Sequence, residues 1–293
     1  PTPSSAASDV YKRQSPSSIS FIGGIRSPIR LGEEVFKNGY LSDAKLKELV
    51  KTIKKYQKTF RNEGIELYEI VATSAFRNSN NSEDARRYLE NKINHPVRII
   101  SGLEEAKLIS YHPKAQSNIN KIYVDVGGGS TECYIFENGK HSIQSFQLGA
   151  VRLMLKKDKK SEWKRMNKWL AEKENIDTLI GLGGNIKAFL NINKSKKMSS
   201  KDFIKNAKNL KGLNIDEKIK KYNFSEDRAD VIDYAMIIFE RIINQLKIKE
   251  IRSTKWGVSD SIAVKTFNEL YSKKISIYKA VSYTHLRAHE TST

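Results

Sequence analysis

Cysteine is almost absent from this chain, and long apolar runs are absent altogether. The one cysteine in 293 residues, Cys133, has no second cysteine with which to form an internal disulfide, so a reducing cytoplasm is the simplest compartment. The longest uninterrupted apolar run, Tyr234–Phe239, is far shorter than the ~20 apolar residues of a membrane helix, so we expect no membrane span and no membrane partner. No charged segment followed by an apolar one opens the chain, so we expect no secretion signal.

Acidic residues are few relative to basic ones. The chain has 52 Lys and Arg against 33 Asp and Glu, which gives a net charge of +19. Such a field attracts polyanions, including nucleic acids and phosphate-rich small molecules. A lysine-rich solvated surface with no such ligand explains the charge equally well, so charge does not identify the chemistry. No RNP, zinc-finger or basic-zipper pattern occurs, so we expect no specific nucleic-acid partner.

Both ends of the chain differ from the rest. Residues 1–14 and 280–293 show neither a helical nor a strand period, and they resemble translated sequencing-adaptor sequence. We therefore interpret them as non-native tails. Between them strand and helix patterns alternate, which is typical of α/β proteins. We expect lobe I at 15–117 and lobe II at 118–279.

Local patterns predict the main elements. Ser42 and Asp43 begin an amphipathic helix that ends at Asn62-Glu63-Gly64. Asn138-Gly139 joins two strands into a hairpin. Further strands are expected at 66–72, 97–100, 122–126, 133–136, 142–146, 178–181 and 251–253, and a turn at 73–81. Further helices are expected from Ser82, from Ser101, near 151, at 163–174, at 228–246, and from Ser259.

A glycine-rich turn follows an apolar strand that ends in an acid, Asp125. The turn consists of Gly127, Gly128, Gly129 and Ser130. Glycines let backbone N–H groups face one concavity and let a phosphate approach closely. Asp125 beside that phosphate suits Mg²⁺, and Glu132 on the return strand could supply a second carboxylate. A hairpin turn that Asp125 merely caps is the alternative.

A second glycine motif, Gly181-Leu182-Gly183-Gly184-Asn185, lies between a strand at 178–180 and a helix at 186–190. A helix N-terminus after a glycine turn can bind a phosphate group. One such motif is weak evidence, because glycine also serves loop geometry alone. Two in one block favour a phosphate site.

Two acids and an arginine complete the candidates. Ser101 and Glu104 have the spacing of a capping box, which gives Glu104 a structural role. Glu105 has no such local partner and is the better candidate for a general base that deprotonates water. An exposed first-turn glutamate is the alternative. Arg77 follows a strand and could grip phosphate, although a surface arginine in a loop would look the same.

Six motifs in order resemble the exopolyphosphatase / guanosine pentaphosphate phosphohydrolase (Ppx/GppA) phosphatases over about residues 19–270. They read ATSAFR, IISGLEEAKL, DVGGGSTE, FQLGAVRL, GLGGN and RADVI. The resemblance implies two actin-like ATPase (ribonuclease H-like) lobes in an α/β fold, with the active site in the cleft between them. It implies Glu105 as catalytic base and Asp125 and Glu132 as magnesium-side carboxylates. It also implies phosphate binding by Arg77 and by the loops at 127–130 and 183–185, and it makes a homodimer plausible.

The chain departs from the family pattern in three places. The opening hairpin with its Asp-x-Gly-Ser-Asn-Ser-like loop is missing, so we expect a truncated lobe I in which the strand at Ile25–Leu31 is unpaired. Lys107 stands where Arg is usual. The late motif, usually Gly-Leu-Arg-Glu-Gly or Gly-Leu-x-Asp-Gly, reads Gly-Val-Ser-Asp-Ser at 257–261. The long C-terminal extension of some members is also missing, which indicates the short two-lobe form.

The leading hypothesis is a Mg²⁺-dependent phosphoanhydride hydrolase that acts on inorganic polyphosphate or guanosine pentaphosphate. Water would attack the terminal phosphorus in line while Glu105 takes its proton. A kinase of the same superfamily would need a base aspartate in lobe I, and none lies near Arg77 or Glu105. A non-catalytic polyanion-binding protein would use the positive charge without Glu105.

Overall fold

The computed structural model describes residues 6–15, 18–27, 29–65, 68–117, 120–272 and 287–289. The chain divides into two compact units. Unit 1 is Gly102–Gly257, and unit 2 comprises the described residues of Ser4–Ser101 and Val258–Thr293. The expected lobes ran over 15–117 and 118–279. The observed division instead joins the helix α5 (Gly102–Leu108), which carries Glu105, to the unit that holds both glycine motifs.

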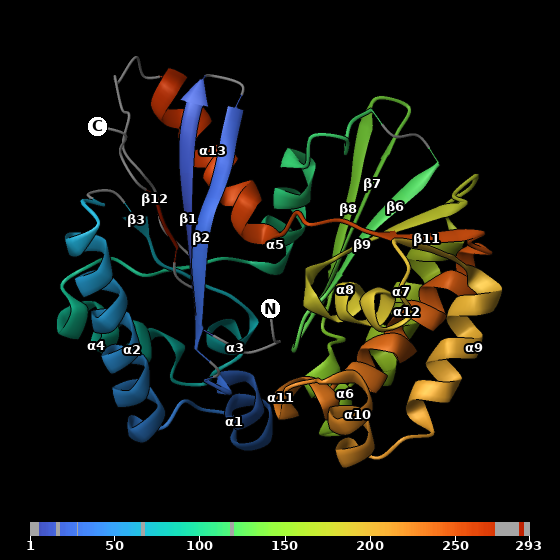
Figure 1. Cartoon of the computed structure of the whole chain (residues 1–293), viewed down its shortest axis with the longest axis horizontal. Helices are drawn as coiled ribbons and strands as arrows, with labels where there is room; N and C mark the ends of the chain where they lie inside the picture. The colour runs from blue at the N-terminus through green and yellow to red at the C-terminus, as the bar shows by residue number, and fades with distance from the viewer. Residues whose placement is uncertain are drawn as a thin grey trace. The chain divides into compact units, whose positions relative to one another are not determined.

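Unit 1 is built on a six-stranded sheet with the order β10-β11-β9-β6-β7-β8 (Figure 1). The strands are β6 (Lys121–Val126), β7 (Thr131–Glu137), β8 (Lys140–Phe146), β9 (Thr178–Leu182), β10 (Lys197–Ser199) and β11 (Glu250–Ser253). β6, β9 and β11 run parallel, whereas β7, β8 and β10 pair antiparallel. All five residues of β9 are buried, which explains its continuous apolar pattern.

The predicted hairpin is confirmed. Asn138 and Gly139 have φ values of 51° and 72°, the left-handed backbone that a two-residue hairpin turn requires. The pairing sets Asp125 of β6 opposite Glu132 of β7, and Glu132 opposite Ser145 of β8. Because directly paired residues point to the same face of a sheet, these three side chains form one polar row.

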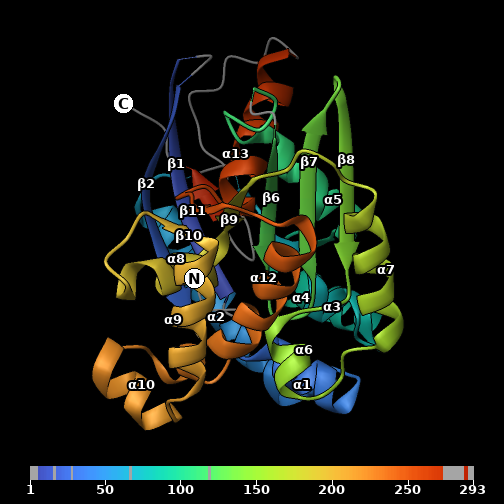
Figure 2. The same ribbon diagram turned by 90° about the vertical axis from the view of Figure 1, so that its right-hand side faces the viewer.

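Helices cover both faces of this sheet. Figure 1 and Figure 2 show α5 on one side of β7 and β8, and α12 (Ile232–Leu246) on the other. α12 also contacts α6 (Ala150–Met154), α7 (Lys160–Ala171), α8 (Gly183–Ile192) and α9 (Ser200–Lys211), while α10 (Ile215–Tyr222) packs on α11 (Glu226–Ala229). The single helix expected at 228–246 is interrupted between α11 and α12, and Arg228 on α11 is buried.

Unit 2 contains a four-stranded sheet, β2-β1-β12-β3, and a separate parallel pair, β4-β5. The strands are β1 (Ala6–Ser15), β2 (Ser18–Ser27), β3 (Tyr68–Glu69), β4 (Val71–Ala72), β5 (Arg98–Ile99) and β12 (Arg287–His289). The helices are α1 (Leu31–Asn38), α2 (Asp43–Asn62), α3 (Ser74–Arg77), α4 (Ser82–Ile93) and α13 (Val258–Ser272). The predicted N-cap of α2 is confirmed, because the Ser42 hydroxyl accepts from the Lys45 N–H at 3.3 Å. Within the described ranges, no helix combines the length and hydrophobicity of a membrane span.

Both terminal segments contribute strands among the residues that the structure describes. β1 pairs antiparallel along β2, and β12 lies between β1 and β3. Strand pairing uses backbone groups, so it does not require the alternating pattern that the sequence lacks. Tyr11 is buried against Phe21, with ring centroids 5.7 Å apart. The strand expected to be unpaired at Ile25–Leu31 is therefore the end of a paired β2, and Leu31 already begins α1.

Candidate active site

Both glycine motifs lie at one edge of the sheet of unit 1. β6 and β9 are adjacent parallel strands, with Asp125 paired to Leu182. Chain segments that follow the carboxyl ends of neighbouring parallel strands meet there, which is where ligands bind in open α/β sheets. The second motif differs from expectation in one respect, because α8 begins at Gly183 and not at 186. Glycine is a poor helix former, so the pattern underestimates the first turn.

Asp125 lies against the second motif. A Cβ atom on Gly183 would be 2.5 Å from Asp125 Oδ1, and Gly183 has φ +76°. Both the close approach and the left-handed backbone require glycine at this position. The carboxylate that ends β6 therefore contacts the glycine turn that follows β9.

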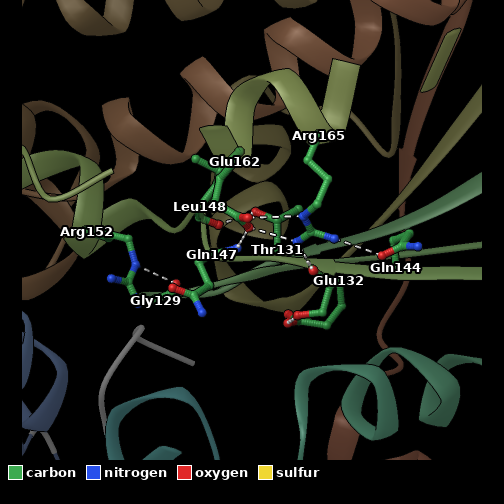
Figure 3. Close-up of polar contacts among 10 residues, drawn as sticks. Gly129, Thr131, Glu132, Gln144, Gln147, Leu148, Arg152, Glu162 and Arg165 are labelled. Carbon is green, nitrogen blue, oxygen red and sulfur yellow. Dashed lines mark hydrogen bonds and ion pairs between the residues drawn. The ribbon is translucent and has the colours of Figure 1, made fainter. Parts of the chain in front are cut away.

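The first glycine loop, 127–130, rests on the N-terminus of α6. Its carbonyl oxygens accept hydrogen bonds from that helix and from the Arg152 side chain, whose Nε donates to Gly129 O at 3.0 Å (Figure 3). The backbone bonds are Ala150 N to Gly127 O at 2.9 Å, and Val151 N and Arg152 N to Gly128 O at 2.9 and 3.1 Å. Arg152 is 8% exposed.

This packing uses the carbonyl oxygens of the loop and not the N–H groups of Gly128 and Gly129. A Cβ on Gly149 would lie 2.5 Å from the Gly128 backbone, so glycine at 149 lets α6 approach the loop. The carbonyls face α6, while the N–H groups of Gly128 and Gly129 donate to no acceptor among the described residues. Consecutive N–H groups in a turn can bind an anion.

Asn185 joins the two glycine motifs. Its Nδ2 donates to Val126 O at 3.0 Å, and its Oδ1 accepts from Arg228 Nη1 at 2.9 Å. Asn185 and Arg228 are 3% and 7% exposed. Burial lowers the pKa of Arg228 to about 10, so the guanidinium remains charged at neutral pH. Since both ends of the Asn185 side-chain amide are engaged, an anion at the N-terminus of α8 would bind backbone N–H groups instead.

The acids of unit 1 influence each other. Burial raises the pKa of Asp125 from its ordinary value of 3.8 to about 7, and the negative charge of Glu105 on α5 adds to the shift. The predicted base and the predicted metal-side carboxylate are therefore within electrostatic reach of each other. A strongly raised carboxyl pKa beside a second acid is a common feature of catalytic sites.

Aromatic residues lie directly behind the acids on the same face of the sheet. Tyr123 and Tyr134 are paired two residues along β6 and β7 from the acids, with ring centroids 6.0 Å apart. They belong to a buried cluster that includes Ile109 and Leu182. Burial raises the pKa of Tyr134 to about 12, so it is neutral at physiological pH. This buried cluster lowers the local dielectric, which strengthens charge interactions in the adjacent polar row.

Asp125 and Glu132 fit a hard divalent cation. They are carboxylates on neighbouring strands, and Glu132 is 2% exposed. A divalent cation would stabilise the ionised form of Asp125, which burial and the charge of Glu105 otherwise disfavour. Within the described residues, no group of three or more His, Cys, Asp or Glu side chains could hold a metal. One or two protein carboxylates, completed by phosphate and water oxygens, is the arrangement that suits Mg²⁺.

Arg77 differs from the other predicted site residues because it belongs to unit 2. The predicted turn at 73–81 contains a short helix, α3, and Arg77 is its last residue. Its Nη1 donates to Ile100 O at 2.7 Å. Its role in phosphate binding stays a prediction.

Sequence reasoning assigned no role to three residues that shape this site. Arg152 and Arg228 lie inside the motifs FQLGAVRL and RADVI, so their presence in those motifs is the signal in the sequence. Both are buried in the structure. Ser145 directly precedes the first of these motifs, and its Oγ donates to Glu132 Oε1 at 2.8 Å. Nothing local in the sequence indicates that contact, because it joins residues on two different strands.

Comparison with known proteins gives a consistent result. The model of the Ppx/GppA phosphatase family matches residues 10–269. The Ppx/GppA family member of Aquifex aeolicus has a similar structure, with a TM-score of 0.71 and 22% identity over 91% of this chain and 97% of that one. An exopolyphosphatase from Cytophaga hutchinsonii gives a TM-score of 0.75 and 18% identity over 90% of this chain and 98% of that one.

At such low identity the structural likeness establishes the fold, a mixed α/β architecture. The family match spans most of the chain and includes both glycine motifs, Asp125 and Glu105. This chain therefore belongs to the Ppx/GppA phosphatase family, whose members are hydrolases that act on phosphoanhydride bonds.

Proposed function

We propose that this protein releases the terminal phosphate from inorganic polyphosphate or guanosine pentaphosphate in a Mg²⁺-dependent reaction. The family match supports phosphoanhydride hydrolysis in general. The similar Cytophaga hutchinsonii structure is an exopolyphosphatase, which favours inorganic polyphosphate as the first substrate to test. The net charge of +19 agrees with a polyanionic substrate of either kind.

The observation that carries the proposal is the position of Asp125. It contacts Gly183 of the second glycine motif, lies two residues before the first motif, and has its pKa raised by burial and by Glu105. One carboxylate thus connects both candidate phosphate loops and the candidate base. A hairpin turn that Asp125 merely caps would not require this convergence.

In the proposed reaction, N–H groups of the two glycine motifs bind the oxygens of the terminal phosphoryl group. Glu105 accepts a proton from a water molecule, whose oxygen forms a bond to the terminal phosphorus. The anhydride P–O bond breaks in line with that attack, and the shortened chain departs with the bridging oxygen. Orthophosphate is the second product. Arg77 is proposed to bind phosphate as well.

Asp125 and Glu132 would hold Mg²⁺, which would supply charge neutralisation for the phosphoryl oxygens. In the cation's absence, the pKa of Asp125 is raised to about 7, so a proton competes with the cation for this carboxylate near neutral pH. Metal binding must therefore displace that proton, which makes metal affinity pH-dependent.

The proposal is tested by phosphate release from both substrates, measured with Mg²⁺ and with excess chelator. We expect Mg²⁺-dependent release from at least one of them. Retention of full activity in chelator would contradict the metal assignment, and no release from either substrate would contradict the substrate class. ATP with an acceptor sugar serves as the control for a kinase.

A further inference from the structure

A serine hydroxyl contacts the buried carboxylate of the polar row. Ser145 of β8 is paired with Glu132 of β7, and its Oγ donates to Glu132 Oε1 at 2.8 Å. Glu132 is 2% exposed, so bulk water does not set the orientation of its carboxylate. A hydrogen bond to a charged carboxylate is among the stronger ones in proteins and fixes the plane of the group.

The backbone of Ser145 is clamped from α7. Arg165 donates through Nη2 to Ser145 O. Its Nη1 donates to Gln144 Oε1 at 2.9 Å (Figure 3). Its guanidinium lies 4.5 Å from the centre of the Phe146 ring. Arg165 thus contacts three consecutive residues at the end of β8.

Two further bonds tie down the segment that follows β8. Glu162 of α7 accepts from the Gln147 N–H at 2.7 Å and also binds Arg165, which holds the pKa of Glu162 below its ordinary value. The buried Thr131 hydroxyl donates to Leu148 O at 2.6 Å, which joins the start of β7 to the same segment (Figure 3). Ser145 therefore presents its hydroxyl from a backbone that α7 and β7 both hold in place.

We propose that Ser145 is a positioning residue that orients Glu132 for the divalent cation. The inference rests on the proposed function, in which Glu132 is one of the two metal-side carboxylates. Ser145 acts through Glu132 and contacts neither the substrate nor the reacting water. Groups that hydrogen-bond to metal ligands typically change metal affinity or activity 10- to 100-fold when removed. Loss of the hydroxyl should thus weaken metal binding.

Three variants separate this role from a structural one. Ser145→Ala removes the donor, Ser145→Thr retains a hydroxyl on a residue that suits a strand, and Ser142→Ala makes the same change three residues away on β8. Ser142 is paired with Ile135, and it has no hydrogen bond to a carboxylate among the described residues. Each is compared with the wild type by calorimetric titration with Mn²⁺, by Mg²⁺ activation of phosphate release, and by thermal unfolding.

We expect Ser145→Ala to weaken Mn²⁺ binding about 10-fold or more and to raise the Mg²⁺ concentration for half-maximal activity in parallel. At saturating Mg²⁺ its kcat should recover to within about threefold of the wild type, and Ser145→Thr should restore most of the affinity. Ser142→Ala should bind Mn²⁺ as the wild type does.

Equal Mn²⁺ affinity in the wild type and a folded Ser145→Ala protein would overturn this inference and leave the proposed function unaffected. If Ser145→Ala does not fold, the other two variants decide. Wild-type Mn²⁺ affinity in Ser145→Thr supports the role of the hydroxyl. Mn²⁺ affinity that is weakened equally in Ser145→Thr and Ser142→Ala overturns it. A wild-type protein that binds no divalent ion would instead contradict the magnesium assignment in the proposed function, and this inference with it.

Discussion

Replacement of Gly183 by alanine should disable the site at a small cost in stability. The added Cβ would lie 2.5 Å from Asp125 Oδ1, whereas ordinary contact begins at 3.4 Å. The carboxylate or the glycine turn must therefore shift by close to an ångström. A misplacement of about 1 Å at a reacting centre can cost roughly 10²-fold in rate. We expect a kcat loss of that order for Gly183→Ala.

A matched control separates this contact from backbone strain. Gly139 in the β7–β8 turn has φ +72°, close to the +76° of Gly183, and a Cβ there meets nothing within 4 Å. Both alanine variants pay the cost of a left-handed backbone, about 1–2 kcal/mol. That cost corresponds to a fall in Tm of roughly 2–8 °C for a domain of this size.

The assay is Mg²⁺-dependent phosphate release beside thermal unfolding for both variants. We expect Gly139→Ala to lose stability while it keeps kcat within about twofold of the wild type at a temperature where it is folded. Gly183→Ala should lose a similar amount of stability and most of its activity. Equal kcat values in the two variants would show that activity does not depend on the close contact of Gly183 with Asp125.

Three further predictions concern the acids. Asp125→Asn should abolish most Mg²⁺-dependent activity and leave the fold intact; unchanged metal dependence would contradict its assignment. Glu105→Gln should lower kcat at least about 10²-fold, whereas Glu104→Gln should change little, because Gln can complete a capping box; equal losses would show that the base is misassigned. The folded pKa of Asp125 is raised from 3.8 to about 7, so its ionisation destabilises the metal-free fold progressively as pH rises through that window. Asp125→Asn should accordingly raise the Tm of metal-free protein more at pH 8 than at pH 4, and equal shifts would contradict the raised pKa.

Features set by neighbouring residues could be read from the sequence. The Ser42 cap, the Asn138-Gly139 turn and the buried strand β9 each depend on a few adjacent residues, and the structure confirms all three. Asp125 near the end of β6 and the glycines after it could also be identified in the sequence, because a phosphate loop is formed by neighbouring residues.

Features set by distant residues could not be read in this way. The bond from Arg228 to Asn185 joins positions 43 residues apart, and the contact of Ser145 with Glu132 depends on strand register. The assignment of α5 to the same unit as the glycine motifs is also a matter of tertiary packing. At the N-terminal end, backbone pairing with β2 overrode a sequence without a strand period.

The proposed reaction requires a water molecule to attack the terminal phosphorus. Hydrolysis of polyphosphate in ¹⁸O-labelled water with Mg²⁺, followed by mass spectrometry of both products, tests it most directly. We expect one ¹⁸O atom in each orthophosphate released by the first turnover and none in the remaining chain. Label in the remaining chain, or release of unlabelled orthophosphate, would contradict attack of water on the terminal phosphorus.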